Sequence, residues 1–229
     1  MSFTLIAHRS DVLASSAGPS TAIDSTGADL LIVTIEGDRN AMLVNLTVPT
    51  DSKSNPWNAL TLRGNVGDGG VQIFWSKPTA VGSGHTITTV ANLFQVIHFE
   101  AWSGSHASPY VTGSENGANG TAITSLATGS TTNPGDLVVT ALVYDLTSGV
   151  PTIDSSFTTR DNQFLAGGVN YGGILADKLS GSAENPTWSF ASTVAATAIA
   201  AFAAAAGGGG VAPAAELDYT KFPKWLLRR

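Results

Sequence analysis

Short apolar runs closed by turn-forming residues constrain the fold of this chain more than any other feature. Each run is rich in Val, Ile, Leu or aromatic residues and is bounded by Gly, Pro, Asn, Asp or Ser, which is typical of strands followed by turns. No run before residue 190 repeats its apolar positions with the helical period of about 3.6 residues. We therefore expect an all-β protein, a jelly-roll-like antiparallel β-sandwich with an extended C-terminal tail. The runs are 28–37, 71–78, 94–104, 136–145 and 171–179.

The segment 191–206 is less clear, because it consists mostly of alanine and other small residues. Alanine favours a helix by intrinsic propensity. Small residues also suit a strand that is packed closely between two sheets, and a closing strand would pair an otherwise open sheet edge. We therefore favour a strand.

Composition excludes several classes of function. The chain has no cysteine, so it has no disulfide framework, no thiol nucleophile and no Cys-ligated zinc. Its 17 acidic and 11 basic residues give a net charge of −6, which argues against nucleic-acid binding through a broad basic surface. Neither a signal peptide nor a membrane span is expected, because the most apolar stretch, 192–206, is shorter than the roughly 20 residues that cross a bilayer. We expect no cofactor.

The two halves of the chain resemble each other weakly. Gly27-Ala-Asp-Leu-Leu-Ile-Val is similar to Gly135-Asp-Leu-Val-Val-Thr, and Val96-Ile-His-Phe is similar to Ile199-Ala-Ala-Phe. The spacing between the matched segments is close to constant, which suggests that two strand sets form two halves of one sandwich. The alternative is that valine-rich strands look alike by chance.

One boundary in composition is sharp. The sandwich domain is expected over 1–206, a Gly/Ala/Pro tether over 207–215 and a separate peptide over 216–229. Residues 1–215 hold seven basic and fifteen acidic residues, whereas 216–229 hold four basic and two acidic residues beside several aromatic ones. The body is therefore acidic, and the C-terminal peptide is aromatic and basic.

This peptide is the sharpest functional feature, because aromatic residues and arginine are enriched where proteins bind one another. We favour docking to a neighbouring protein subunit, through a homo-oligomer or a larger assembly. Packing against the chain's own domain and contact with a membrane surface are the alternatives. The residues expected to bind the partner are Tyr219, Phe222, Trp225, Leu226, Leu227, Arg228 and Arg229.

The order of several segments resembles a β-sandwich module of phage and prophage virion proteins. The segments are Gly27-Ala-Asp-Leu-Leu-Ile-Val, Thr50-Asp-Ser-Lys-Ser-Asn-Pro-Trp-Asn-Ala-Leu-Thr, Val71-Gln-Ile-Phe-Trp-Ser-Lys-Pro, Val81-Gly-Ser-Gly-His-Thr-Ile-Thr and Asn185-Pro-Thr-Trp-Ser-Phe. The resemblance covers about residues 20–205 and implies a structural or decoration protein of the capsid or tail, located in the virion. Ser54 stands where a Gly is usual in that module, and Pro56 where a Thr is usual, so we expect a differently shaped turn.

Catalytic and metal sites are not indicated. Gly82-Ser-Gly-His places a serine beside His85 without a nucleophile motif around it. His98 and Glu100 share one face of a strand but lack the further ligands that zinc needs, and His98 is expected to be a packed histidine. No pair among Glu36, Glu100, Glu115 and Glu184 can be assigned to a cleft from sequence alone. Oxygen ligands for calcium would come from loops, but turn chemistry explains most of them better; these are Asp51, Asn55, Asp154, Asp161 and Asn162.

Carbohydrate binding is the main alternative function, in a module that recognises a host surface or cell wall. Flat aromatic faces would carry it, and the candidate glycan-binding residues are Trp57, Trp102 and Trp188. Trp75 and Trp102 lie in runs that also read as core. Trp57 and Trp188 follow an Asn-Pro turn, which suggests a repeated structural corner.

Overall fold

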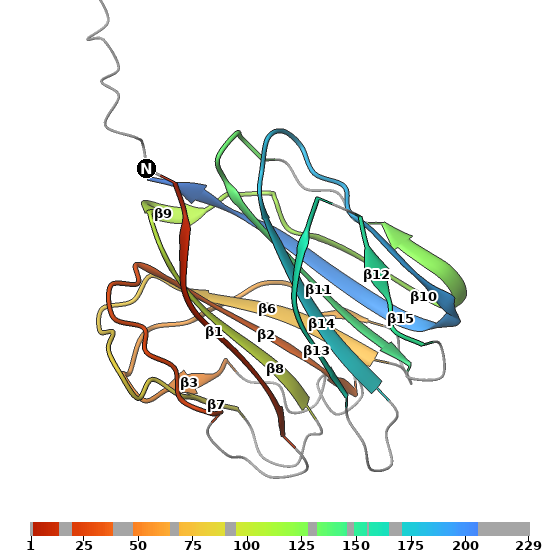
Figure 1. Ribbon diagram of the computed structural model, residues 1–229, viewed down its shortest axis with the longest axis horizontal. Coiled ribbons are helices and arrows are strands. Elements are labelled where there is room, and N and C mark those ends of the chain that lie inside the picture. The colour runs from red at the N-terminus through yellow and green to blue at the C-terminus, as the bar shows by residue number, and fades with distance from the viewer. Residues whose placement is uncertain are drawn as a thin grey trace, which may run out of the picture.

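The structure of the chain is a computed structural model. The protein folds into antiparallel β-sheets, and the described part of the chain contains no helix. The prediction of an all-β antiparallel sandwich is confirmed (Figure 1). The described residues are 2–13, 20–38, 48–64, 69–89, 95–127, 132–145, 149–154, 156–164 and 171–205, with the backbone alone at 121–127 and 192–193.

The first half of the chain forms one sheet in the order β1-β8-β2-β6, to which two short strands add at β6. Leu30 to Gly37 pair with Trp102 to Gln95, so the most apolar strand, β2, lies in the centre. Beside this sheet, β3 pairs with β7. The strands are β1 (Thr4–Leu13), β2 (Leu30–Asp38), β3 (Thr50–Asp51), β4 (Asn58–Ala59), β5 (Arg63–Gly64), β6 (Gly69–Ser76), β7 (Ile87–Thr88) and β8 (Gln95–Ser103).

The second half forms the other sheet in the order β10-β15-β11-β14-β13, with β9 and β12 also pairing with β15. The segment 191–206 is a strand for most of its length, as expected, because β15 runs to Ala204. It lies inside the sheet between β10 and β11, and the expectation that it closes an edge was wrong. The strands are β9 (Ser105–Tyr110), β10 (Asn116–Ala127), β11 (Leu137–Asp145), β12 (Thr152–Ile153), β13 (Thr158–Phe164), β14 (Tyr171–Leu179) and β15 (Thr187–Ala204).

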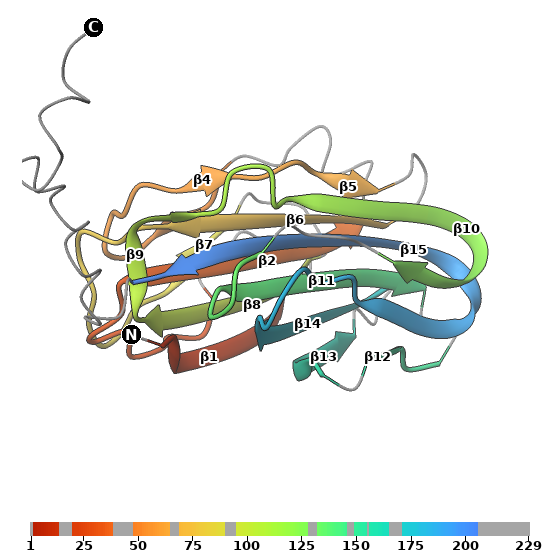
Figure 2. The same cartoon turned by 90° about the horizontal axis from the view of Figure 1, so that it is seen from above.

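The two sheets have the same strand order. In each, the first long strand of its half pairs with the last, the last pairs with the second, and the second pairs with the last but one. When the sheets stack, β1 lies against β13 at one side and β5 lies against β10 at the other (Figure 2). An approximate two-fold axis therefore relates the two halves, with β2 and β11 at its centre.

Of the two sequence matches between the halves, one joins residues that are equivalent by this symmetry and the other does not. Gly27 and Gly135 both occupy the left-handed position of a turn that precedes a central strand, at φ 85° and 91°. At the last strand, however, Leu30 pairs with Trp102 and Leu137 with Phe202, so Trp102 is the equivalent of Phe202. The expected match of Phe99 with Phe202 was wrong, because Phe99 packs on the outer side of its sheet and Phe202 packs between the sheets.

Apolar side chains form three clusters. One lies between the sheets around Leu30, Ile73, Val139 and Phe202. The other two lie on the outer faces, one around Phe99 on the first sheet and one around Trp188 on the second. Residues of loops and short strands, such as Ile87 and Phe157, pack into these two outer clusters.

Candidate functional site

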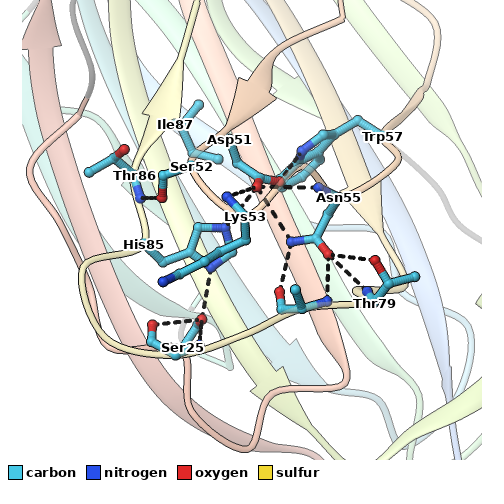
Figure 3. Close-up of polar contacts among 12 residues, drawn as sticks. Ser25, Asp51, Ser52, Lys53, Asn55, Trp57, Thr79, His85, Thr86 and Ile87 are labelled. Carbon is cyan, nitrogen blue, oxygen red and sulfur yellow. Dashed lines mark hydrogen bonds and ion pairs between the residues drawn. The ribbon is translucent and has the colours of Figure 1, made fainter.

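A network of polar contacts surrounds Asp51 at the outer face of the first sheet (Figure 3). Asp51 Oδ1 accepts hydrogen bonds from the backbone N–H groups of Lys53 (2.7 Å) and Asn55 (3.3 Å), and Oδ2 accepts one from Trp57 Nε1 (2.7 Å). The Asn55 side chain continues the network, because its Oδ1 accepts from the backbone N–H of Thr79 at 2.8 Å. Asp51 thus fixes the loop from Lys53 to Trp57 through hydrogen bonds to its backbone and to the Trp57 indole.

Ser54 lies at the tip of this loop with φ 60°, which is the only positive φ of a non-glycine residue in the described ranges. Its N–H donates to the Asp51 carbonyl at 3.2 Å, which closes the turn. The turn therefore uses the left-handed conformation that a glycine would adopt most easily. With a serine at this position, the backbone is strained because the Cβ atom lies close to the following carbonyl oxygen.

Ser25, His85 and Asp51 lie together in a serine–histidine–aspartate arrangement that the sequence pattern did not predict, in which only Ser25 and His85 are hydrogen-bonded. Ser25 Oγ lies 2.8 Å from His85 Nδ1, and His85 Nε2 lies 3.4 Å from Asp51 Oδ1. Sequence adjacency had drawn attention to Ser83, whereas the partner of His85 comes from a segment 60 residues away.

This arrangement fixes loops and leaves the serine no path to a substrate. Ser25 and His85 are fully buried. Ser25 Oγ also accepts the backbone N–H of Gly82 at 3.0 Å, so the hydroxyl is occupied on several sides. A nucleophile must reach the atom it attacks, and we therefore interpret the arrangement as structural.

A second polar cluster lies inside the sandwich, between β1, β8 and β2 of one sheet and β13 and β14 of the other. It fills one side of the space between the sheets, beside the apolar cluster around Leu30. Four of its members, Thr34, Glu36, His98 and Glu100, are completely buried. The whole set is His8, Ser10, Thr34, Glu36, His98, Glu100, Arg160, Asp161, Gln163 and Asp177.

Glu36 and His98 face each other with little compensation for their burial. His98 Nε2 lies 3.8 Å from Glu36 Oε2, which is too far for a strong ion pair. Neither carboxyl oxygen of Glu36 and neither ring nitrogen of His98 has a well-formed hydrogen bond among the described residues, although the backbone of Gly173 faces the ring. Uncompensated burial of this kind favours the neutral form of both groups.

Glu100 has more polar contacts than Glu36 to compensate for its burial. Trp102 Nε1 donates to its Oε2 at 2.9 Å, and Arg160 Nε lies 3.9 Å from its Oε1. Arg160 binds Asp177 with both Nε and Nη2 and also lies over the Trp102 ring. One guanidinium therefore faces two carboxylates, and it bonds directly to Asp177 alone.

Burial sets the protonation states of the interior groups. It raises the pKa of Glu36 well above its usual value and raises that of Glu100 to about 8, with the nearby Asp177 adding to the rise at Glu100. It lowers the pKa of His98 to about 3, and the neighbouring His8 contributes to that fall. At neutral pH the interior therefore contains a neutral His98, and burial favours the protonated form of Glu36.

Two of the tryptophans expected to bind glycans cannot do so. Trp102 is 3% exposed and packs between the sheets, and Trp188 is fully buried on the outer face of the second sheet, so these two expectations were wrong. Trp57 is partly buried, with its ring edge-on to Phe99 and its N–H bound to Asp51. The Asn-Pro turns before Trp57 and Trp188 each deliver an indole to the outer cluster of one sheet.

The oxygen atoms considered for calcium serve protein contacts instead. Asp51 accepts the backbone N–H of Lys53, and Asn55 accepts that of Thr79. Asp154 accepts the N–H of Thr187, Asp161 accepts the hydroxyl of Ser10, and Asn162 accepts the hydroxyl of Tyr144. Among the described residues, no group of three or more His, Asp or Glu side chains is placed to hold a metal ion.

The C-terminal residues expected to bind a partner lie outside the described residues: Tyr219, Phe222, Trp225, Leu226, Leu227, Arg228 and Arg229. Docking through them stays a prediction. No helix in the described ranges is long and apolar enough to cross a membrane.

Comparisons with protein-family models, with curated proteins and with solved structures found no match for the chain.

The sequence pattern predicts only part of the interior cluster, namely that His98 and Glu100 share one face of a strand. In the structure, β8 does turn both side chains between the sheets. The partners on β1 and β13 were missed because these strands carry mixed polar sequences that do not stand out as apolar runs. Because Arg9 and Asp11 flank Ser10, the sequence carries no alternation with apolar residues that could have placed His8 and Ser10 on an inward face.

Proposed function

We propose that the chain is a structural protein of a phage particle, which decorates or builds a capsid or tail surface and assembles through its C-terminal peptide. The resemblance to virion β-sandwich modules supports this proposal. Its location would be the virion, and its partners would be other copies of the chain or neighbouring virion proteins.

The observation that carries the proposal is that the sandwich is complete before the tether begins. Ala204 pairs with Ser105 on β9, and the N–H of Ala205 donates to the Gly104 carbonyl at 2.7 Å. The last strand is thus fixed at the end of the molecule near the point where the chain passes from the first sheet to the second. A peptide that follows a finished domain and a glycine tether is well placed to bind another subunit.

Charge gives a second argument for assembly. Residues 1–215 carry fifteen acidic and seven basic residues, whereas residues 216–229 carry four basic and two acidic ones. A basic peptide on one subunit is complementary to the acidic body of the next, which favours encounter between copies. The aromatic residues would supply the affinity once the peptide is in place.

The first experiment compares the mass in solution of the full chain and of residues 1–206 by light scattering on a sizing column. We expect the full chain to assemble and the shorter chain to be a folded monomer. A full-length Phe222→Ser/Trp225→Ser variant should behave like the shorter chain. A matched variant in the tether, Val211→Ser, should assemble normally.

The second experiment asks about the particle itself. Density-gradient particles from the encoding source should contain the full chain, and deletion of residues 207–229 should abolish its incorporation. The peptide does not serve as the anchor if the truncated chain is incorporated at full occupancy. The virion assignment fails if the full chain is absent from particles and is found only as free protein.

A further inference from the structure

The sheet edges on one side of the sandwich are regular, whereas those on the other side are interrupted. β1 and β13 lie along the same rim (Figure 2), and each pairs with one neighbour only among the described strands. β1 pairs with β8 residue for residue from Ala7 to Leu13. At the opposite rim, β10 changes register twice along β15, and β4 and β5 contain two residues each. Short strands and bulges prevent strand addition at an edge, so the β1–β13 rim is the one suited to accept another strand.

The charges on β1 are complementary to those of a second β1 strand. Ser10 faces the other sheet, so its neighbours Arg9 and Asp11 both lie on the outer side. Arg9 Nε lies 3.7 Å from Asp11 Oδ1, and the Arg9 side chain is 51% exposed. Charges of a single sign protect an edge strand, because two such edges repel each other. Opposite charges two residues apart attract the same strand when it runs in the opposite direction.

We infer that β1 of one copy of the chain pairs antiparallel with β1 of a second copy, around a two-fold axis at Ser10. Arg9 of each copy then lies opposite Asp11 of the other, which gives two equivalent ion pairs. This interface does not involve the C-terminal peptide, so it goes beyond the proposed function.

The face of the sheet and the charges together select this register. A slip of one residue would join the outer face of one sheet to the inner face of the other, because side chains alternate along a strand. A slip of two residues would place Arg9 opposite Arg9, or Asp11 opposite Asp11. Like charges directly opposite each other are destabilising, so the register centred on Ser10 is favoured.

The second sheet has its edge at the same axis. Ser10 Oγ lies 2.6 Å from Asp161 Oδ2 and 2.8 Å from Gln163 Nε2, so an axis at right angles to the sheets passes near Asn162. The two β13 strands then face each other, with Asp161 of one copy opposite Gln163 of the other. The Asp161 side chain is 43% exposed and can accept a hydrogen bond from that carboxamide. Both sheets therefore continue from one copy into the next.

The contact is small, because each copy contributes only two edge strands. Interfaces that bury less than about 1,200 Å² are weak, so we expect a Kd of roughly 0.1–1 mM. The dimer should form in concentrated solution and dissociate at the lower concentrations of a sizing column. Where copies are held side by side on a larger assembly, their high local concentration favours the contact.

Single cysteines test the register, because the chain contains no cysteine of its own. Arg9→Cys and Asp11→Cys are made separately in the full-length Phe222→Ser/Trp225→Ser variant, so that the C-terminal peptide does not bring copies together. Facing residues lie about 4.5–5.5 Å apart between Cα atoms, which a disulfide can bridge, whereas residues on the diagonal lie about 7–8 Å apart. After mild oxidation in concentrated solution, a mixture of the two proteins should contain about ten times more disulfide-linked dimer than either protein alone.

Charge reversal in the same background tests the ion pairs. Arg9→Glu places two carboxylates opposite each other, and Asp11→Lys places two cations opposite each other, so each variant alone should lose the dimer in sedimentation equilibrium at about 1 mM. A mixture of these two variants has an attractive pair at both positions and should recover the dimer, which also shows that both are folded. Lys53→Glu makes the same change of charge in the loop before Trp57 and should dimerise like the parent variant.

Three results would overturn the inference. The first is a monomer at about 1 mM in the background variant. The second is an equal yield of linked dimer in the mixed and the separate cysteine samples, and the third is unchanged association of Arg9→Glu. These outcomes are independent of the proposed function, because absence of the chain from particles would contradict that function and leave the edge contact in place.

Discussion

Ser54 holds a left-handed backbone conformation, at φ 60°, with its side chain exposed to solvent. A side chain in this region costs about 1 kcal/mol or more relative to glycine. We expect Ser54→Gly to raise the free energy of unfolding by about 0.5–1 kcal/mol, since relief of strain outweighs the greater freedom of glycine in the unfolded chain. Urea unfolding followed by tryptophan fluorescence measures the change. Ser54→Ala keeps the strain and should give no gain, and an equal gain in both variants would contradict this explanation.

Glu36 and His98 give the free energy of unfolding two opposite dependences on pH. The pKa of Glu36 is raised in the folded protein, so its contribution is complete below the unfolded value of 4.5 and is lost as pH rises towards the folded pKa. The pKa of His98 falls from 6.5 to about 3, so its contribution is complete above 6.5 and is lost as pH falls through that interval. As pH rises from 4.5, the loss of stability at Glu36 therefore opposes the gain at His98.

Glu36→Gln should remove the alkaline part of this dependence. Glutamine cannot ionise, so the variant should gain about 1.4 kcal/mol relative to wild type for each pH unit above 4.5 over which Glu36 stays protonated in the fold. Urea unfolding at a series of pH values from 4 to 8 measures the difference. At pH 4 the carboxyl is protonated in the folded protein, so the gap between the two proteins should be smallest there. A gap that does not change with pH would mean that Glu36 is ionised in the folded state.

At the scale of elements, β14 lies very close to β2 and β8, and Gly173 makes this approach possible. A Cβ atom at Gly173 would meet Val96 Cβ at 2.8 Å and Glu36 Cβ at 3.1 Å. We expect Gly173→Ala to lower the free energy of unfolding by about 1–3 kcal/mol, the usual cost of overpacking an interior. Gly181→Ala is the matched control, because no atom lies within 4 Å of its added Cβ, and it should change stability little. Equal effects of both variants would show that the sheets can move apart without cost.

The five apolar runs predicted as strands correspond to β2, β6, β8, β11 and β14. These are inner strands of their sheets, and burial on both faces gives them near-continuous runs of Val, Ile and Leu. The edge strands β1, β10 and β13 were not predicted, because an edge strand is partly exposed and its sequence can be polar, as in Asn116–Ala127. A search for apolar runs therefore finds the inner strands and does not find polar edge strands.

The polar clusters were harder to predict than the strands. Ser25, His85 and Asp51 are far apart in the chain, and only the return of their loops to one outer face brings them together. The contact of Ser10 with Asp161 joins residues 151 positions apart, and it depends on how the two sheets stack. A pattern along one strand shows which side chains share a face, but it does not show which strand lies opposite.

At the scale of the whole molecule, each sheet is built from one half of the chain. The link between them is short: Ser103 ends β8 and Ser105 begins β9, while the Asp29 carboxylate accepts the N–H groups of Gly104 and Ser105. The apolar cluster between the sheets contains residues from both halves, including Ile32, Val71, Val139 and Phe202. Neither half can bury this cluster alone.

We therefore expect the fragments 1–104 and 105–229 to show no cooperative unfolding when separate, because each exposes the inner face of its sheet. Mixed during refolding, they should recover the near-ultraviolet circular dichroism of the intact chain, because the sheets contact each other mainly through side chains rather than through shared backbone ladders. Fragments cut inside a sheet, at residue 77, should recover it poorly, since β2 and β6 must then find β8 as a separate chain. A fragment 1–104 that unfolds cooperatively on its own would show that one sheet with its outer cover is already a stable unit, and that the stacking of the halves adds stability without determining the fold.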